Sequence, residues 1–381
     1  MKKILFFTNI APHYRKNLWE KLIETSNFEM VFYFGKNKNI NIKEIDFTKE
    51  PFKQHSIKLV GIKNFWFKNR ILIWQQGVIK NCLSGQYDVA IFLGELTNVS
   101  TWIASIVSRL RGKRVIFWTH GLYGNEEFLK KKIRILFYSL SNDIFVYEKR
   151  AKKLLIEAGF NENQVHSIYN SLDYDTHLKV RNKLNFENFQ VDTSSFFEND
   201  SNPLLIFVGR LTKVKKIEQI LEAIKILNED GLQVNFLIIG DGPQKSFLKN
   251  LIGDFFLNNQ VYLYGSCYNE SILGYLISKA VLCISPGNVG LTAIHSMTYG
   301  TPVCTHSNLC TQMPEVESII DGITGCFFQE NDVQGLAHTI KKWLNNKLDS
   351  NLIKQNCYTI VDNTYNPENQ LHIMSKILND E

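Results

Sequence analysis

Residues 285–303 read Ser-Pro-Gly-Asn-Val-Gly-Leu-Thr-Ala-Ile-His-Ser-Met-Thr-Tyr-Gly-Thr-Pro-Val, a stretch that joins a strand to a helix. The apolar run at residues 280–284 is typical of a buried strand, and Ser-Pro-Gly-Asn ends it with residues that favour turns. Helix-compatible residues begin at about Gly290. Gly300-Thr301-Pro302 then ends the helix before another short apolar run at residues 303–304.

This turn has the composition of an anion-binding site. Backbone N–H groups and the positive end of the helix dipole stabilise a phosphate at a helix start, and Gly290 lets a ligand approach the main chain. Such turns also serve as plain connections in α/β proteins. The stretch alone therefore predicts either a phosphate site or a connection.

Length and composition indicate a globular protein of about two domains, since the chain has 381 residues. The apolar runs are far shorter than a membrane span, and Met1-Lys2-Lys3 leads into a strand and not into a signal peptide. We therefore expect a cytoplasmic protein. The seven cysteines form no Cys-x-x-Cys pair, which favours small core residues over disulfides or a zinc site.

Charge is divided unevenly along the chain. Residues 1–180 contain 28 Lys and Arg against 16 Asp and Glu, so this part carries +12 and the remainder −6 of the net +6. A basic half can face nucleic acid, an anionic membrane or a phosphorylated substrate. Charge alone does not choose among them.

The order of apolar runs predicts an α/β protein with two Rossmann-like, doubly wound domains that face a cleft. Runs in the first half lie at residues 4–7, 30–34, 89–93, 115–118, 144–147 and 165–169, and runs in the second half at 204–208, 234–239, 261–264, 281–284 and 303–304. We place the first domain at residues 1–175, a polar linker at 176–202, and the second domain at 203–360. Residues 361–381 are expected to form a helix that packs back toward the first domain.

A basic loop follows the first strand of the second domain and reads Gly209-Arg210-Leu211-Thr212-Lys213-Val214-Lys215-Lys216. Arg210 and Lys215 can clamp a pyrophosphate, the first as a fork and the second as a point charge. An ordinary solvated loop is the alternative. The turns Gly240-Asp241-Gly242-Pro243 and Tyr264-Gly265-Ser266, together with Gly290-Leu291-Thr292, favour a nucleotide diphosphate site.

Taken in order, these motifs resemble the family-four retaining glycosyltransferases. The likeness also includes Ser-Pro-x-x-x-Gly-Leu-x-x-x-His-Ser-Met-x-x-Gly-Thr-Pro-Val, Pro314-Glu315, Asp321-Gly322-Ile323-Thr324-Gly325 and, ahead of the linker, Tyr169-Asn170-Ser171-Leu172-Asp173. It covers the second domain nearly end to end. The resemblance implies the glycosyltransferase-B fold and transfer of a sugar from a nucleotide diphosphate donor with retained configuration, without a metal ion or other cofactor.

The same resemblance implies the donor site. Arg210 and Lys215 would act in catalysis and, with Gly209, hold the diphosphate, to which Gly290, Leu291 and Thr292 would offer N–H groups. The base would lie near Ser266 and Cys267. The family's Glu-x7-Glu pattern is replaced here by Gly287 and His295. A neutral imidazole at His295 can accept a hydrogen bond from the ribose, although a packed helix residue is the alternative, and Asn288 can reach the sugar hydroxyls.

Candidate residues in the first domain follow predicted strands. His120 is a candidate catalytic residue by the resemblance, which suggests contact with the donor sugar or the acceptor. His13, Arg15 and Glu95 are candidate acceptor-binding residues. The alternatives are a structural histidine, ordinary turn polarity and helix capping.

Two segments of the basic half combine aromatic or aliphatic residues with cations, at residues 63–74 and 128–137. Such segments bind anionic membranes through buried apolar area plus about 1 kcal/mol per nearby cation. An ordinary surface helix is the alternative for either. We favour a protein peripheral to the inner face of the cell membrane, and no nucleic-acid recognition motif accompanies the charge.

The sequence thus predicts a retaining glycosyltransferase that uses a nucleotide sugar, first of all a UDP-sugar, to extend a lipid-linked glycan of a capsule, O-antigen or exopolysaccharide. Two alternatives stay open, namely a catalytically silent relative that binds a nucleotide sugar or a protein, and a nucleotide-sugar epimerase. A nicotinamide dehydrogenase is disfavoured because no Gly-x-Gly-x-x-Gly follows the first strand.

Overall fold

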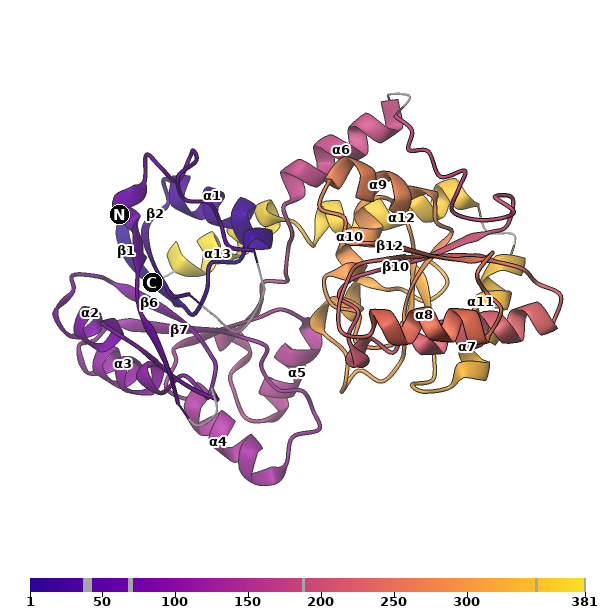
Figure 1. Cartoon of the computed structure of the whole chain (residues 1–381). Helices are drawn as coiled ribbons and strands as arrows, with labels where there is room; N and C mark the ends of the chain where they lie inside the picture. The colour runs from indigo at the N-terminus through magenta and orange to yellow at the C-terminus, as the bar shows by residue number, and fades with distance from the viewer. Residues whose placement is uncertain (37–42, 68–70, 187–188, 347–348, 380–381) are drawn as a thin grey trace. The chain divides into compact units, whose positions relative to one another are not determined.

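The chain forms two compact units, described here from a computed structural model (Figure 1). The structure describes residues 1–36, 43–67, 71–186, 189–346 and 349–379. The first unit contains residues 1–173 and 366–381, and the second contains residues 174–365.

Parallel strands form the sheet of the first unit. In its described part seven strands pair in the order β3-β2-β1-β6-β7-β8-β9, all in parallel. Side chains of the central strands are buried on both faces, which explains the continuous apolar runs in the sequence. The strands are β1 (Lys2–Thr8), β2 (Phe28–Phe34), β3 (Leu59–Gly61), β6 (Val89–Leu93), β7 (Arg114–Thr119), β8 (Asp143–Val146) and β9 (Val165–Ser167).

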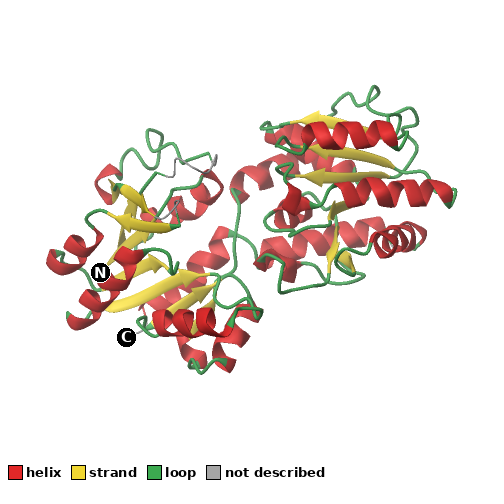
Figure 2. Ribbon diagram, turned by 60° about the horizontal axis from the view of Figure 1, so that its bottom comes forward, coloured by secondary structure: helices red, strands yellow, loops and turns green. Residues whose placement is uncertain are grey.

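Helices cover both faces of this sheet (Figure 2). A separate antiparallel hairpin joins β4 (Asn64–Phe67) to β5 (Leu72–Gln75). The helices are α1 (Lys16–Glu24), α2 (Val78–Ser84), α3 (Val99–Leu110), α4 (Phe128–Tyr138), α5 (Lys149–Glu157) and α13 (Pro367–Asn379), with the short 3-10 helix η1 (His13–Arg15) before α1.

The C-terminal helix α13 belongs to the first unit, where it packs beside α1 (Figure 1). Met374 and Leu378 are fully buried in the core on the α1 side of the sheet. Arg114 donates a hydrogen bond to the carbonyl of Ile377 at 2.8 Å. The chain therefore returns to the first unit after it completes the second.

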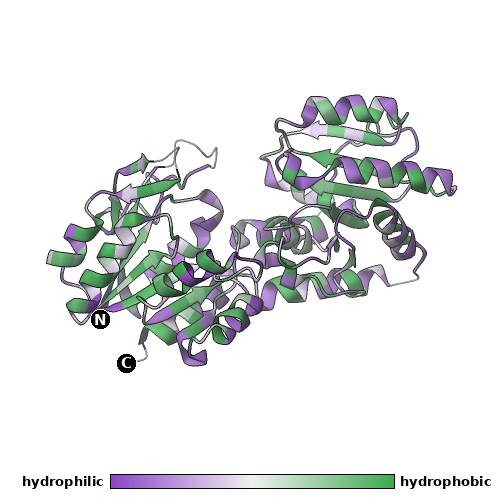
Figure 3. Cartoon of the chain, turned by 90° about the horizontal axis from the view of Figure 1, so that it is seen from below, coloured by the Kyte–Doolittle hydropathy of each residue, from purple (hydrophilic) through white to green (hydrophobic). Residues whose placement is uncertain are grey.

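The second unit contains another parallel sheet. In its described part six strands pair in the order β12-β11-β10-β13-β14-β15. Strands of both sheets are mostly hydrophobic, whereas hydrophobic and hydrophilic residues alternate along the outer helices (Figure 3). The strands are β10 (Leu204–Val208), β11 (Asn235–Ile239), β12 (Val261–Gly265), β13 (Leu282–Ser285), β14 (Val303–His306) and β15 (Gly325–Phe328).

Helices of the second unit follow its strands in the alternating order of a Rossmann-like fold. They are α6 (Tyr174–Phe186), α7 (Glu218–Glu229), α8 (Lys245–Asp254), α9 (Glu270–Lys279), α10 (Thr292–Thr298), α11 (Val333–Asn345) and α12 (Ser350–Asn363), with the 3-10 helices η4 (Lys213–Lys215) and η5 (Pro314–Ser318). The prediction of two Rossmann-like α/β domains is confirmed.

The expected linker at residues 176–202 needs a correction, because its first part is helix α6 of the second unit. Arg181 of α6 makes a two-point ion pair with Asp362 at 3.0 and 2.9 Å, and it lies over the ring of Tyr358. Tyr174 donates to the same carboxylate at 2.7 Å. Asp362 lies 181 and 188 positions away from these two residues, so the polar composition of the segment did not reveal the contacts.

Candidate functional site

Three loops converge at the carboxyl ends of β10, β11 and β13. The Gly209 N–H donates to Ile239 O at 3.0 Å, and the Leu211 N–H donates to Asp241 O at 3.0 Å. A Cβ atom at Gly240 would lie 1.8 Å from Gly209 O, so only glycine permits this approach. The basic loop that begins at Gly209 therefore packs against the turn of Gly240, Asp241 and Gly242. The two meet because parallel strands place their carboxyl ends at the same edge of the sheet.

Lys215 is anchored by the loop that follows β13. Its Nζ atom donates to the Asn288 carbonyl at 2.6 Å and to Asn288 Oδ1 at 2.9 Å. Burial lowers the pKa of the Lys215 ammonium, and the nearby carboxylate of Glu315 opposes this shift. Lys215 is therefore a positioned, partly desolvated cation.

Gly287 packs directly against the same basic loop. A Cβ atom there would lie 2.0 Å from Val214 O and 2.8 Å from Lys215 Cα, and the Gly287 N–H donates to Lys215 O at 3.2 Å. The first position of the expected Glu pair thus has no room for a side chain. Asn288, the neighbour predicted to compensate, has its side-chain oxygen on Lys215.

The buried side-chain amide of Gln312 holds the loop that follows β13 in place. Gln312 accepts the Val289 N–H at 2.9 Å and donates to Thr305 Oγ1 at 2.8 Å and to His306 O at 3.0 Å. Thr305 in turn donates to Ser285 O at 2.7 Å. Sequence analysis missed this network because a single Gln after a turn carries no distinctive signal.

The start of α10 lies at the end of β10. Thr292 donates from its hydroxyl to Val208 O at 3.2 Å, and Gly290 has a left-handed backbone with φ of 55°. The first backbone N–H groups of a helix have no partner within the helix. The predicted loop residues Gly290, Leu291 and Thr292 are therefore brought to the same edge as Gly209.

The remaining donor-site candidates are more accessible. Arg210 and Ser266 are exposed, and Cys267 is half-buried with its thiol 3.6 Å from Asn269 O. Ser266 and Cys267 lie between β12 and α9, and Asn269 caps the first turn of α9 through its side-chain oxygen. Solvent access at Arg210 leaves its guanidinium available to an anion.

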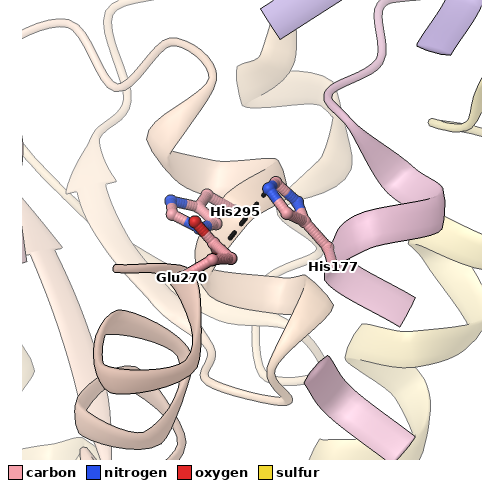
Figure 4. Close-up of side chains that lie close together, drawn as sticks. All are labelled: His177, Glu270 and His295. Carbon is pink, nitrogen blue, oxygen red and sulfur yellow. Dashed lines mark hydrogen bonds and ion pairs between the residues drawn. The ribbon is translucent and has the colours of Figure 1, made fainter. Parts of the chain in front are cut away.

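His295 of α10 takes part in a compact polar cluster (Figure 4). Its Nε2 atom lies 2.7 Å from Glu270 Oε1, and Tyr299 donates its hydroxyl to the same oxygen at 2.6 Å. The His177 ring stacks on the His295 ring at 4.9 Å, and its Nε2 atom lies 3.6 Å from Glu270 Oε1. Sequence analysis singled out His295 but neither Glu270 nor His177.

The surroundings of this cluster favour the charged form of Glu270 and the neutral form of His177. Burial opposes ionisation of Glu270, but His295 and His177, with the Tyr299 hydroxyl, lower the pKa of Glu270 to about 2. Burial lowers the pKa of His177 to about 4, the His295 ring acts in the same direction, and Glu270 opposes the shift. At neutral pH the cluster therefore contains an ionised carboxylate and a neutral His177.

In the first unit, His120 and Glu95 line one cavity of about 130 Å³. Tyr123 and Arg134 complete its polar wall. Burial, reinforced by Arg15 and Arg134, lowers the pKa of His120 to about 4, so the ring is neutral near pH 7. Its Nδ1 atom is buried and has no hydrogen-bond partner among the described residues.

Charge around Glu95 is balanced by Arg134. Desolvation by surrounding protein atoms raises the pKa of Glu95 and the Arg134 guanidinium opposes this rise, although solvent reaches the Glu95 side chain. Arg134 also donates to Gly121 O at 3.0 Å and pairs with Glu126 at 3.3 Å. Sequence analysis assigned Arg134 to a membrane helix and therefore missed its place in the cavity wall.

Arg15 lies close to His120 through a shared aromatic neighbour. Its guanidinium donates to the Tyr147 hydroxyl at 2.6 Å and stacks over Trp118 at 4.9 Å, while the His120 ring lies 4.8 Å from the Tyr147 ring. His13 instead donates its backbone N–H to Lys43 O, and burial together with Lys43 lowers its pKa. Three of the four first-unit candidates are thus brought together.

The two proposed membrane segments differ in structure. Residues 128–137 fall within α4, whose side chains Phe128, Leu129 and Leu136 are 73%, 68% and 61% exposed. Residues 63–74 fall on the β4–β5 hairpin, not on a helix, and residues 68–70 lie outside the described residues. In the part of the chain that the structure describes, no helix is long and apolar enough to cross a membrane.

Comparison with protein families matches residues 189–359 to the family described as "Glycosyl transferases group 1". The chain is 28% identical over 200 residues to an uncharacterized 41.2 kDa protein in the cps region of Klebsiella pneumoniae, a match that covers 50% of each chain. It is 23% identical over 193 residues to the capsular polysaccharide biosynthesis glycosyltransferase CapM of Staphylococcus aureus, covering 49% of this chain and 50% of the relative. The chain thus spans about half the length of these curated relatives.

Among solved structures, the chain is similar to Anabaena HepE in complex with UDP. The TM-score is 0.67 at 14% identity, and the match covers 99% of both chains. At this identity the likeness concerns the fold. It confirms the expected architecture of two Rossmann-like domains, the glycosyltransferase-B fold.

Proposed function

Because residues 189–359 match the family described as "Glycosyl transferases group 1", we propose that the chain is a retaining glycosyltransferase that moves a sugar from a nucleotide diphosphate donor. UDP is the proposed nucleotide, since the similar fold of HepE is described in complex with UDP. The acceptor is a lipid-linked glycan of a surface polysaccharide. The similarity to CapM and to a protein of a cps region supports a role in the synthesis of a surface polysaccharide.

The observation that carries the proposal is the anchored ammonium of Lys215. Among the described residues, Asn288 oxygens take two of its N–H groups, and an ammonium has three. The third is available for a phosphate oxygen. Arg210 is exposed on the same loop, and its guanidinium is a planar, two-point donor. A diphosphate can therefore bind the ammonium of Lys215 and the guanidinium of Arg210 together.

Catalysis in this proposal depends on charge stabilisation at the leaving group. As the bond between the anomeric carbon and the diphosphate oxygen breaks, negative charge grows on the diphosphate. Lys215, Arg210 and the N–H groups at the start of α10 would stabilise that charge where it develops. The acceptor hydroxyl attacks from the same face and passes its proton to the departing phosphate, which leaves the configuration retained. No metal ion or cofactor is part of this step.

The cavity of the first unit is the proposed place for hydroxyl groups of the sugar or acceptor. Neutral His120 can accept a hydrogen bond, and Glu95 and Arg134 offer both signs of charge beside it. We assign acceptor contacts to Glu95 and Arg15. His13, which lies against Lys43, is the more peripheral of the proposed residues.

Membrane association of the first unit accounts for its exposed apolar side chains. Ile103, Ile106 and Leu110 of α3 are 41%, 45% and 84% exposed. Helix α3 packs beside α4 through Trp102 and Phe137, whose rings lie 4.6 Å apart. With Lys130 to Lys132 next to the exposed residues of α4, the surface has the chemistry that binds an anionic bilayer.

The test is a thermal-shift screen of the full chain against UDP, GDP, ADP and their sugars, followed by transfer to a lipid-linked glycan. Arg210→Ala is the test variant because its exposed side chain supports no packing, and Lys249→Ala, an exposed lysine of α8, is the matched control. Ligand at about 100 times its Kd should add about 2.7 kcal/mol of stability. We expect the UDP shift to be lost in Arg210→Ala and kept in Lys249→Ala.

A silent nucleotide-sugar binder is a second candidate, favoured by the absence of room for a side chain at Gly287. Selective UDP binding with no transfer and no hydrolysis of UDP-sugars would support it against the enzyme. An equal UDP shift in Arg210→Ala and the wild-type chain would refute the proposed donor site.

A further inference from the structure

Three side chains with metal-binding atoms meet in the second unit, from elements far apart in sequence (Figure 4). His177 comes from α6, Glu270 from the first turn of α9, and His295 from α10. Their donor atoms all lie within 4.8 Å of one another. His177 is 7% exposed, so the cluster is closed to solvent on the α6 side.

The distances are close to those around a tetrahedral ion. Ligand atoms about 2.1 Å from Zn²⁺ are about 3.4 Å from each other. His177 Nε2 already lies 3.6 Å from Glu270 Oε1, and His295 Nε2, now at 2.7 Å from that oxygen, needs to move by about 0.7 Å. The donor atoms of the cluster lie up to 4.8 Å apart, and the His177 and His295 rings are stacked with their planes 23° apart. One imidazole must therefore turn before both rings can direct a lone pair at the same ion.

Hydrogen bonding within the protein does not account for His177. Its Nε2 atom is beyond ordinary hydrogen-bond distance of Glu270, and its Nδ1 atom is buried without a partner among the described residues. A buried polar ring without partners is costly. A cation at Nε2 supplies the missing interaction.

We propose that His177, Glu270 and His295 bind a divalent transition-metal ion, with Zn²⁺ as the ion that this donor set fits best. Two imidazoles and one carboxylate are a recognised zinc donor set with an open fourth position. The Tyr299 hydroxyl, 2.6 Å from Glu270 Oε1, or a water can fill that position. Coordination uses the lone pair of His295 Nε2, so the proton between this atom and Glu270 must leave Nε2. A neutral ring moves it to Nδ1, and an imidazolium releases it to solvent.

The hydrogen bonds that the ligands make outside the cluster set the expected affinity. We expect micromolar affinity, because the unpartnered Nδ1 of His177 lacks the second hydrogen bond that strengthens metal-binding histidines about 10–100-fold.

The ion would attach α6 to the body of the second unit. Helix α6 is the first element of that unit, and the cluster links it to α9 and α10. Metal binding is thus expected to raise the melting temperature of the second unit. This role is independent of the proposed transfer, in which no metal takes part.

The experiment is calorimetric titration of the chelator-treated full chain with Zn²⁺, without nucleotide, and a visible spectrum with Co²⁺. The test variants are His177→Gln and His295→Gln. His338→Gln, an exposed histidine of α11, is the matched control, and a Cys267→Ser/Cys310→Ser variant removes the two cysteines that are not buried. We expect one ion per chain, the intense Co²⁺ bands of tetrahedral coordination, and more than about 100-fold weaker binding in both test variants only.

The outcomes separate this site from others. No heat with millimolar Zn²⁺, unchanged affinity in both test variants, or loss of binding in the cysteine variant would each overturn the proposal. If circular dichroism shows that a test variant is misfolded, anomalous scattering from zinc-soaked wild-type crystals decides. A peak among His177, Glu270 and His295 supports the site, and a peak elsewhere or none refutes it.

Discussion

Replacement of Gly287 by Ala should destabilise the second unit and disturb Lys215. The added Cβ atom would lie 2.0 Å from Val214 O and 2.8 Å from Lys215 Cα, so η4 or the Gly287 loop must move by about 1 Å. Both nearest groups are backbone and cannot rotate away. The backbone of Gly287 is outside the left-handed region, so the cost is steric and not conformational.

The magnitude follows from the contacts that this movement disrupts. Overpacking of this kind costs about 1–3 kcal/mol. The Gly287 N–H bond to Lys215 O and the two Lys215 bonds to Asn288 are strained as well, at about 0.5–1.5 kcal/mol for each one lost. A total of about 2–4 kcal/mol should lower the melting temperature of this unit by roughly 10 °C.

The assay is thermal and urea unfolding of Gly287→Ala, with Gly253→Ala as the control. Gly253 lies in α8, and a Cβ atom there meets nothing within 4 Å, so this change should stabilise the protein by about 0.5–1 kcal/mol. The same displacement predicts a smaller UDP-induced shift in Gly287→Ala. A Gly287→Ala protein that melts within about 1 °C of wild type would refute the packing argument.

Three further results are expected. Gln312→Ala removes a buried amide that joins three backbone and side-chain partners, so urea unfolding should show a loss of about 1–3 kcal/mol that exposed Gln334→Ala does not show. Because the pKa of His177 is lowered to about 4 while the unfolded ring titrates near 6.5, the unfolded state gains protons first, and stability should fall between about pH 6.5 and 4. The loss should be on the order of 3 kcal/mol when unfolding by urea is measured with a chelator present. It should be smaller in His177→Gln. A pH profile of stability that is identical in this variant and the wild-type chain would contradict the role of His177. Leu129→Ser/Leu136→Ser should reduce cosedimentation with anionic vesicles at unchanged melting temperature, since both side chains are exposed, whereas equal vesicle binding would exclude α4 as the contact.

Local sequence predicted the central strands well, because strands buried on both faces of a parallel sheet must be continuously apolar. Residues 89–93 and 204–208 were placed with the observed bounds of β6 and β10. Two of the four edge strands gave no such signal, whereas β9 and β12 were predicted. The short strand β3, only partly buried, and the strand β15 were not predicted, and the hairpin of β4 and β5 interrupts a segment treated as a candidate surface helix.

The sequence by itself determined the alternation of strands and helices and the residue types of the loop from Gly209 to Lys216, since these depend on neighbours in the chain. Tertiary structure decided what those residues contact. It placed Asn288 on Lys215, left no space beside Gly287, and brought His177 to Glu270 and His295. Such contacts join elements that local propensity treats as independent, and the close packing of the folded units alone fixes which of them meet.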